Sequence, residues 1–164
     1  MRCRDKCMFL SLSLAIVVST ISLAATSTRP ETFVGRWKSE IPGIGWYIID
    51  RYSDGNFIQK ACVVRTMGEP PIVSLAWGRW SVNGSRYILS FQFRSDNAGP
   101  STIVNQIQKA SKTSLQYYQS RSDVKYVDEQ KQPWLEPIES VHCPEARSEP
   151  DVKYPEWSKR SPNG

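Results

Sequence analysis

The chain has little of the chemistry that catalytic and metal centres use. Its 164 residues include one histidine and four cysteines. The histidine, His142, lies beside Cys143 in a proline-rich stretch, a poor place to hold a nucleophile and a base in fixed geometry. Even together with Cys62, these side chains are too few for a closed zinc site. The sequence therefore predicts no catalytic triad and no metal site.

Phosphate-binding and acid–base signals are also weak. The stretch Gly43-Ile44-Gly45 lacks the following helix that a glycine-rich phosphate loop needs, so no nucleotide cofactor is expected. Among the carboxylates, Asp54 is interpreted as a turn residue, Asp50 as a strand-face charge near Arg51, and Glu40 as a strand end. We therefore predict that the protein is not an enzyme, and a small hydrolase or isomerase ranks last among the alternatives.

The chain has no run of five or more basic residues, although its formal net charge is +5. Basic side chains without a patch and without interleaved exposed aromatics do not make a nucleic-acid surface, so no nucleic-acid partner is expected. They are interpreted instead as charges on solvated strand faces. The residues concerned are Arg36, Lys38, Arg51, Lys60, Arg65, Arg79, Arg86 and Arg94.

A long apolar run occurs once, at the N-terminus. Arg2, Arg4 and Lys6 precede the uncharged stretch from Met8 to Leu23, and small residues follow it. This order is typical of a secretory signal peptide over residues 1–24, and it predicts a secreted or periplasmic protein. A membrane anchor is the alternative, but the run is short of the ~20 apolar residues that a span needs. No later segment is apolar enough to span, so no membrane span is expected in the mature chain.

Sustained helical periodicity is missing, and short alternating segments separated by turn signals take its place. Asp54-Gly55 and Asn83-Gly84 are strong hairpin signals because both favour positive φ. The fold class predicted is all-β, an antiparallel up-and-down meander of about eight strands forming a lipocalin-like or flattened barrel over residues 33–128. The expected strands are 33–40, 46–52, 57–64, 72–82, 86–94, 102–109, 113–120 and 124–128.

From residue 129 onward the composition changes. Six of the eleven prolines fall in residues 129–164, which predicts an extended tail that docks on the barrel up to about Cys143 and is disordered beyond it. Cys62 and Cys143 remain after signal removal, and two cysteines in a small secreted domain most often pair. The bond would staple the tail to the barrel and contribute roughly 4 kcal/mol for a loop of about 80 residues. Two unpaired thiols are the alternative.

Three motifs carry a resemblance to a known family. Gly35-Arg36-Trp37 resembles the first-strand Gly-x-Trp of lipocalins, and the stretch from Gly78 to Tyr87 resembles an element of small bacterial lipocalin-like proteins of the calycin type. The turn from Tyr52 to Phe57 is similar to a hairpin of the same group. The resemblance covers about residues 33–120. It implies that Trp37 packs across the barrel floor, and it also supports a Cys62–Cys143 bond.

The aromatic residues exceed what one barrel floor needs, which favours a lipocalin-like protein that binds a small apolar or amphipathic ligand. The alternative is a barrel filled by its own side chains, acting as an envelope or interaction protein with an unknown protein partner. The candidates for lining a cavity are Trp80, Tyr87, Phe91 and Tyr117, with Arg79 or Arg94 at the mouth for an acidic head group. A register slip of one residue would reverse every inward assignment. Asn83-Gly84-Ser85 is also a glycosylation pattern, which matters only for a eukaryotic source.

Overall fold

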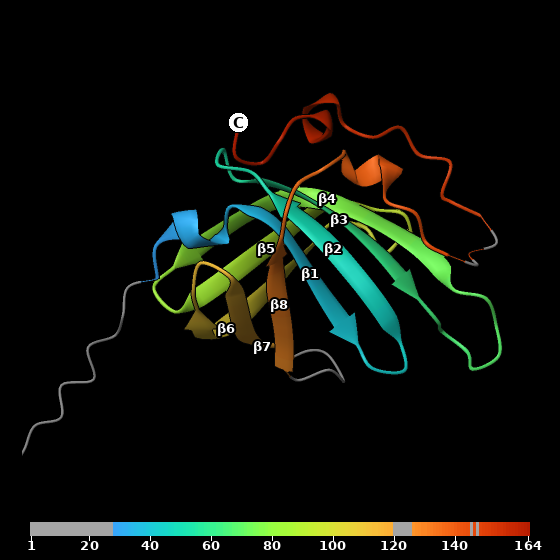
Figure 1. The fold of residues 1–164 in the computed structure, drawn as a ribbon, viewed down its shortest axis with the longest axis horizontal. Helices are drawn as coiled ribbons and strands as arrows, with labels where there is room; N and C mark the ends of the chain where they lie inside the picture. The colour runs from blue at the N-terminus through green and yellow to red at the C-terminus, as the bar shows by residue number, and fades with distance from the viewer. Residues whose placement is uncertain (1–27, 120–125, 145, 147) are drawn as a thin grey trace, which may run out of the picture.

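Hairpin turns and alternating side chains organise the chain into an antiparallel barrel (Figure 1). The computed structural model describes residues 28–119, 126–144, 146 and 148–164. Within these residues eight strands pair in sequence order, and the last closes on the first, where Trp37 lies opposite Lys131. The predicted fold class is confirmed. The expected signal peptide, residues 1–24, lies outside the described residues.

All eight expected strands are present. They are β1 (Gly35–Ile41), β2 (Gly45–Arg51), β3 (Asn56–Val63), β4 (Ile72–Asn83), β5 (Arg86–Arg94), β6 (Ser101–Ala110), β7 (Ser114–Gln119) and β8 (Tyr126–Gln132). A 3-10 helix, η1 (Pro30–Phe33), precedes them, and η2 (Ile138–Ser140) and η3 (Glu156–Lys159) follow. β8 runs past the expected barrel end at residue 128, so Glu129 lies in the barrel wall. Across the described ranges, no helix is both long and apolar enough to cross a membrane.

The hairpin turns follow from local chemistry. Gly55 and Gly84 have φ of 81° and 59°, a region that costs glycine little. The Asp54 side chain accepts a 3.0 Å hydrogen bond from the Asn56 backbone N–H, as its interpretation as a turn residue implies. These turns connect β2 to β3 and β4 to β5 at the same end of the barrel.

Gly78 lies opposite a bulge in β5, where Gln92 is the extra residue. The register between β4 and β5 shifts between Trp77 and Gly78, and a Cβ built on Gly78 would lie 2.0 Å from the Ser90 carbonyl oxygen. Only glycine lets the two backbones approach this closely. The extra residue turns Phe93 to the outer face of the sheet, where its ring stacks on that of Trp77 with centroids 3.9 Å apart.

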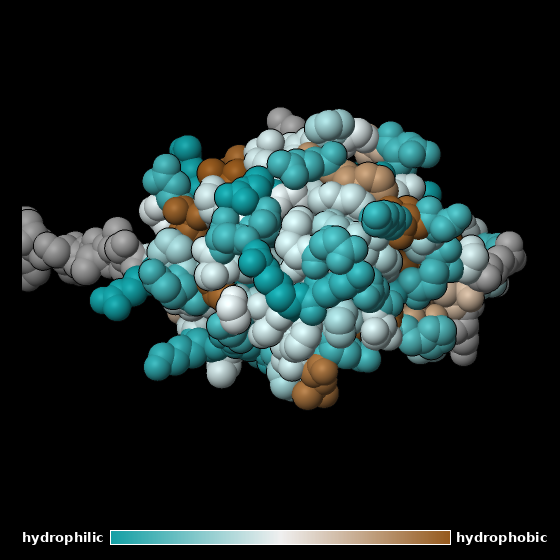
Figure 2. All heavy atoms as spheres, turned by 90° about the horizontal axis from the view of Figure 1, so that it is seen from above, coloured by the Kyte–Doolittle hydropathy of each residue, from teal (hydrophilic) through white to brown (hydrophobic). Residues whose placement is uncertain are grey.

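The tail covers the outer face of β2, β3 and β4, where it crosses the top of the view in Figure 1. Ile138 and Trp157 pack with Tyr52, Ile58 and Leu75 in a second apolar cluster outside the barrel. The rings of Trp157 and Tyr52 meet edge to face at 5.2 Å. Figure 2, which views the molecule from the tail side, shows mostly hydrophilic to neutral residues with small isolated apolar spots. The tail therefore covers the apolar outer face of the sheet and presents a more polar surface to solvent.

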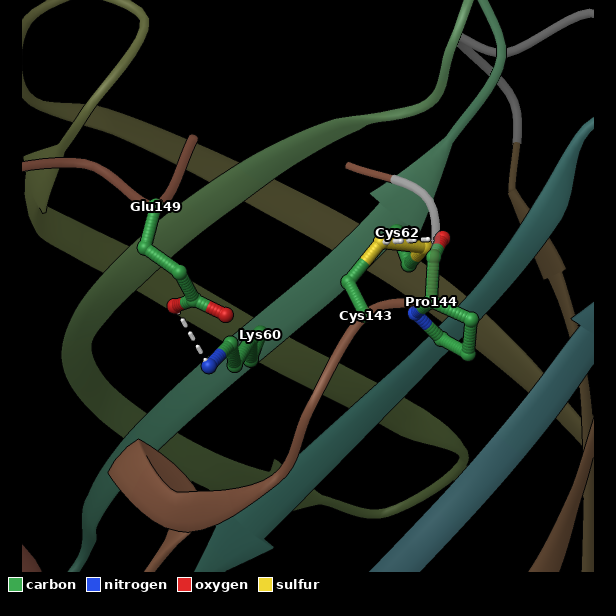
Figure 3. The surroundings of a disulfide bond; sticks show 5 residues. All are labelled: Lys60, Cys62, Cys143, Pro144 and Glu149. Carbon is green, nitrogen blue, oxygen red and sulfur yellow. Dashed lines mark hydrogen bonds and ion pairs between the residues drawn. A yellow bond between two sulfur atoms is a disulfide. The ribbon is translucent and has the colours of Figure 1, made fainter. Parts of the chain in front are cut away.

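Two side chains of β3 hold this tail in place (Figure 3). Cys62 forms a disulfide bond with Cys143, 81 residues away, which confirms the predicted bond. Lys60 is fully buried and pairs with Glu149 at 2.6 Å. The Lys60 ammonium also donates a 3.3 Å hydrogen bond to the Glu139 carbonyl. The sequence predicts disorder beyond Cys143, whereas in the structure Glu149 and Trp157 contact the barrel wall.

The expectation that basic residues lie on solvated faces is wrong for three of them. Arg36, Arg51 and Lys60 are at most 5% exposed. Arg36 makes a two-bond ion pair with Asp50, at 2.7 and 2.6 Å, so Asp50 is a buried partner of Arg36 and not a strand-face charge beside Arg51. Burial raises the Asp50 pKa, and the hydrogen bonds and charge of Arg36 oppose that rise. A buried charge is tolerated when an opposite charge pairs with it, and the tertiary structure supplies each partner.

Candidate functional site

A cavity of about 250 Å³ occupies one half of the barrel. Ile41, Val63 and Arg94 end their strands and line it, so it lies at the end of the barrel where these strands finish. The adjacent inward positions of β3 and β4 carry the small side chains Ala61 and Ser74, which are register partners. The space exists because these inward side chains do not reach the barrel axis. Its apolar lining consists of Ile41, Ala61, Val63, Ala76, Leu89, Phe91, Ile103 and Val127.

The other half of the barrel is filled. Phe33 of η1 is fully buried, and its ring lies 5.2 Å from that of Tyr87 and 6.3 Å from that of Trp80. Trp37, also fully buried, donates a 2.8 Å hydrogen bond from Nε1 to the Phe33 carbonyl, and Trp80 donates one of 3.0 Å to the Tyr52 carbonyl. These aromatic groups fill and close one end of the barrel. The sequence leaves two alternatives, a ligand cavity and an interior filled by side chains, and each of them describes one half of the barrel.

A buried polar network separates the two halves. Arg51 and Glu129 are both fully buried and joined by hydrogen bonds of 2.8 and 2.7 Å from Arg51 Nη2. The hydroxyls of Tyr47 and Tyr117 each lie 2.8 Å from Glu129 Oε1 and 2.8 Å from each other. Arg51 Nε donates to the Tyr87 hydroxyl at 2.6 Å. Because Tyr47 and Tyr117 also line the cavity, this network forms its floor.

The network's ionisation states follow from burial and charge. Burial raises the pKa values of Tyr47 and Tyr117 well above the ordinary value, and the negative Glu129 raises them further. Burial acts to lower the pKa of Arg51, but the Glu129 carboxylate and the neighbouring phenols raise it more, so its pKa lies above the ordinary value. The floor therefore contains two neutral phenols and a compensated ion pair.

The phenol hydrogens are already used within this network. Each hydroxyl has one hydrogen, and the two hydrogens serve three short O···O contacts among Tyr47, Tyr117 and Glu129. The hydroxyl oxygens can therefore offer a ligand only their lone pairs. This side of the cavity accepts hydrogen bonds.

Asn105 is the unsatisfied polar group of the cavity wall. It lies on β6 between the inward-facing Ile103 and Ile107, is fully buried, and lines the cavity. Neither Nδ2 nor Oδ1 has a hydrogen-bond partner among the described residues. Buried amides are normally hydrogen-bonded, so a group that enters the cavity would gain both a donor and an acceptor here.

The charge at the mouth is already paired. Arg94 donates to the Asp96 carboxylate from Nε at 3.1 Å and from Nη2 at 2.6 Å. Its hydrogen bond holds the Asp96 pKa below the ordinary value. The Arg94 guanidinium also lies 5.5 Å from the centroid of the Phe91 ring. Asp96 therefore neutralises the positive charge of Arg94 at the rim of the cavity.

The structure separates the six residues that the sequence suggested for a ligand site. Phe91, Tyr117 and Arg94 line the cavity, while Trp80 and Tyr87 belong to the filled half. Arg79 faces the outside, where it donates hydrogen bonds to Asn56 Oδ1 at 2.9 Å and to the Asp54 carbonyl at 2.8 Å. Strand alternation sends its side chain away from Trp80, its inward neighbour.

Sequence reasoning misses four residues of the site. The sequence assigns Glu129 to the tail and Arg51 to a solvated face, and it gives no role in the site to Tyr47 or Asn105. The signal for two of them was the alternation itself, since Arg51 shares its parity with Tyr47 and Ile49, and Asn105 lies between Ile103 and Ile107. A polar residue at an inward position of a barrel strand marks either a buried network or a ligand contact.

The histidine and cysteine side chains of the described residues, His142, Cys62 and Cys143, do not line the cavity. Within the described ranges, no three His, Cys, Asp or Glu side chains cluster closely enough to hold a metal ion. His142 is exposed, beside the disulfide-bonded Cys143.

In sequence comparisons, no protein-family model and no curated protein matches this chain.

Proposed function

We propose that this protein is a secreted or periplasmic lipocalin-like barrel that binds a small amphipathic molecule in the cavity beside Tyr47, Tyr117 and Asn105. The observation that carries the proposal is the half-hollow interior, in which apolar walls surround a few polar groups. This combination is the usual composition of a small-molecule site. The buried Trp37 at the closed end agrees with the resemblance to lipocalins.

The ligand is small. A cavity of about 250 Å³ falls just short of the ~300 Å³ at which drug-sized sites begin. This volume equals that of roughly eight water molecules at ~30 Å³ each. This space suits one substituted ring or a short acyl chain.

The disulfide bond supports the location, because such bonds persist in oxidising compartments. The proposed role is binding and not catalysis. The three carboxylates considered for acid–base chemistry already have structural partners. Asp50 pairs with Arg36, Glu40 pairs with Lys38, and Asp54 contacts Asn56 and Arg160.

The test is a titration with ethylbenzene and acetophenone, each a ring with one short substituent, followed by NMR. We expect amide shifts at residues lining the cavity and a rise in Tm. Ala76→Leu, which fills part of the cavity, should weaken binding at least about tenfold. The matched control, Ser81→Leu, changes an exposed position of the same strand and should leave binding unchanged. If neither of these compounds nor any other singly substituted ring of this size binds, the proposal is rejected in favour of an interaction protein.

A further inference from the structure

Asn105 distinguishes this cavity from an apolar pocket. Its side-chain amide presents one donor, Nδ2, and one acceptor, Oδ1, side by side in a fully buried position. Both atoms lack a partner among the described residues, although Asn105 lines the cavity. A buried polar group left unsatisfied is costly, and a ligand group that pairs with it recovers that cost.

The charges around the cavity argue against an ionic ligand. Among the described lining residues Arg94 alone carries a formal charge, and Asp96 pairs with it. Below the floor, Arg51 and Glu129 neutralise each other. A charged ligand group would lose its hydration and meet no free opposite charge. The walls therefore favour a neutral ligand.

The polar groups also favour a ligand that both donates and accepts. Tyr47 and Tyr117 offer lone pairs, because their hydrogens are used within the floor network. A carboxylate or a ketone has acceptors only, so it would satisfy Asn105 Nδ2 and leave Oδ1 unpaired. An ammonium group has donors only and would leave Nδ2 unpaired.

We propose that the ligand carries an uncharged group with a hydrogen-bond donor and acceptor side by side, such as a carboxamide or a lactam, and that this group pairs with the side-chain amide of Asn105. The inference rests on the proposed binding function and adds the chemical class of the ligand. The two hydrogen bonds run from Asn105 Nδ2 to the ligand carbonyl and from the ligand N–H to Asn105 Oδ1. The apolar remainder of the ligand lies against Phe91, Leu89 and Val127, which line the same cavity.

The experiment compares four compounds of similar size, namely benzamide, acetophenone, benzoate and ethylbenzene, by calorimetry or NMR titration. We expect the wild-type protein to bind benzamide about tenfold more tightly than acetophenone or benzoate, since one compound satisfies both amide atoms. Asn105→Leu, which keeps the branching at Cγ and removes both polar atoms, should remove the preference for benzamide and keep ethylbenzene binding. The matched control is Gln106→Leu, at the exposed neighbouring position, which should keep the preference.

Each other result has a definite meaning. Equal affinity for benzamide and acetophenone, or a preference that survives Asn105→Leu, overturns the role of Asn105 while the binding function stands. Tightest binding of benzoate overturns the neutral class. If none of the four compounds binds, the proposed function itself fails. Asn105→Leu removes an unsatisfied buried amide, so it should unfold at no lower temperature than the wild type, and circular dichroism during heating checks this.

Discussion

Arg51 and Glu129, 78 residues apart in the chain, form an ion pair in which both side chains are fully buried. The pair joins β2 to β8 across the barrel interior and, with Tyr47 and Tyr117, separates the aromatic closed end from the cavity. A buried pair loses the hydration of both ions, and it is stable only when its geometry and its additional hydrogen bonds compensate. Here two phenols supply further hydrogen bonds to the carboxylate. The same contacts therefore form the floor of the cavity and connect β8 to β2 through the barrel interior.

Removing the Glu129 charge should destabilise the protein strongly. Glu129→Gln leaves the Arg51 guanidinium buried without an opposite charge, and we expect a loss of about 3 to 5 kcal/mol in the free energy of unfolding. Urea denaturation measures this loss. The control is Glu156→Gln in the exposed pair with Lys159, which should change stability by less than about 0.5 kcal/mol. Equal midpoints for the two variants would contradict the structural role of the pair.

Alkaline pH should weaken the fold because the buried phenols of Tyr47 and Tyr117 resist ionisation. The folded-state pKa values of Tyr47 and Tyr117 lie well above the ordinary value because of burial and the Glu129 charge. In the unfolded chain both groups ionise near pH 10. Their contribution to stability is therefore complete below about pH 10 and is lost as the pH rises from there toward the folded-state values.

Urea denaturation from about pH 8 to about pH 11, together with the absorbance of tyrosinate, tests this dependence. We expect the free energy of unfolding to fall above about pH 10, and part of the tyrosinate signal to develop only as the protein unfolds. The double variant Tyr47→Phe with Tyr117→Phe should show a shallower decline, whereas Tyr126→Phe, at an exposed position, should follow the wild type. Full tyrosine ionisation in a folded protein would rule out the buried network.

The disulfide bond should contribute a large share of the stability. Cys62 and Cys143 close a long loop, so replacing both with Ser should cost roughly 4 kcal/mol in the chain-entropy description. Thermal denaturation of this variant, and of the wild type with a reducing agent, measures the loss. We expect the barrel to remain folded at low temperature because its core cluster does not contain these cysteines. An unchanged Tm in both experiments would show that the bond is energetically unimportant.

Gly78 should tolerate no side chain. A Cβ at this position would meet the Ser90 carbonyl oxygen at 2.0 Å, so Gly78→Ala must separate β4 from β5 or remove the bulge. The expected cost is about 1 to 3 kcal/mol or more, measured by urea denaturation. Ser90→Ala is the control, because the contact involves the backbone oxygen and not the Ser90 side chain. If both variants are equally stable, the close approach of the strands is not required.

The sequence predicted the strands well because strand signals are local. Asp54-Gly55 and Asn83-Gly84 determine hairpins within a few residues, and alternation of side chains identifies the strands on either side. The closing strand was the exception. β8 has few apolar residues, and Glu129 occupies an inward position where an apolar side chain is expected, so the barrel end was predicted too early.

The locations of the buried charges could not be predicted in the same way. Arg36, Arg51 and Lys60 resemble surface residues in the sequence, since each partner lies on another element: Asp50 on the adjacent strand, Glu129 on β8 and Glu149 in the tail. The cavity depends likewise on where small side chains from different strands meet. Ala61 and Ser74 are ordinary strand residues until the register places them opposite each other.

By itself, the sequence determined that the chain forms an antiparallel barrel with a proline-rich tail held by Cys143, because turn chemistry, alternation and cysteine pairing act through local or simple constraints. The tertiary structure decided which end of the barrel is filled, which charges are buried together, and that the unpaired amide of Asn105 lies in the wall of the cavity. Those properties depend on register and packing between distant segments, where a shift of one residue reverses the direction of every side chain in a strand.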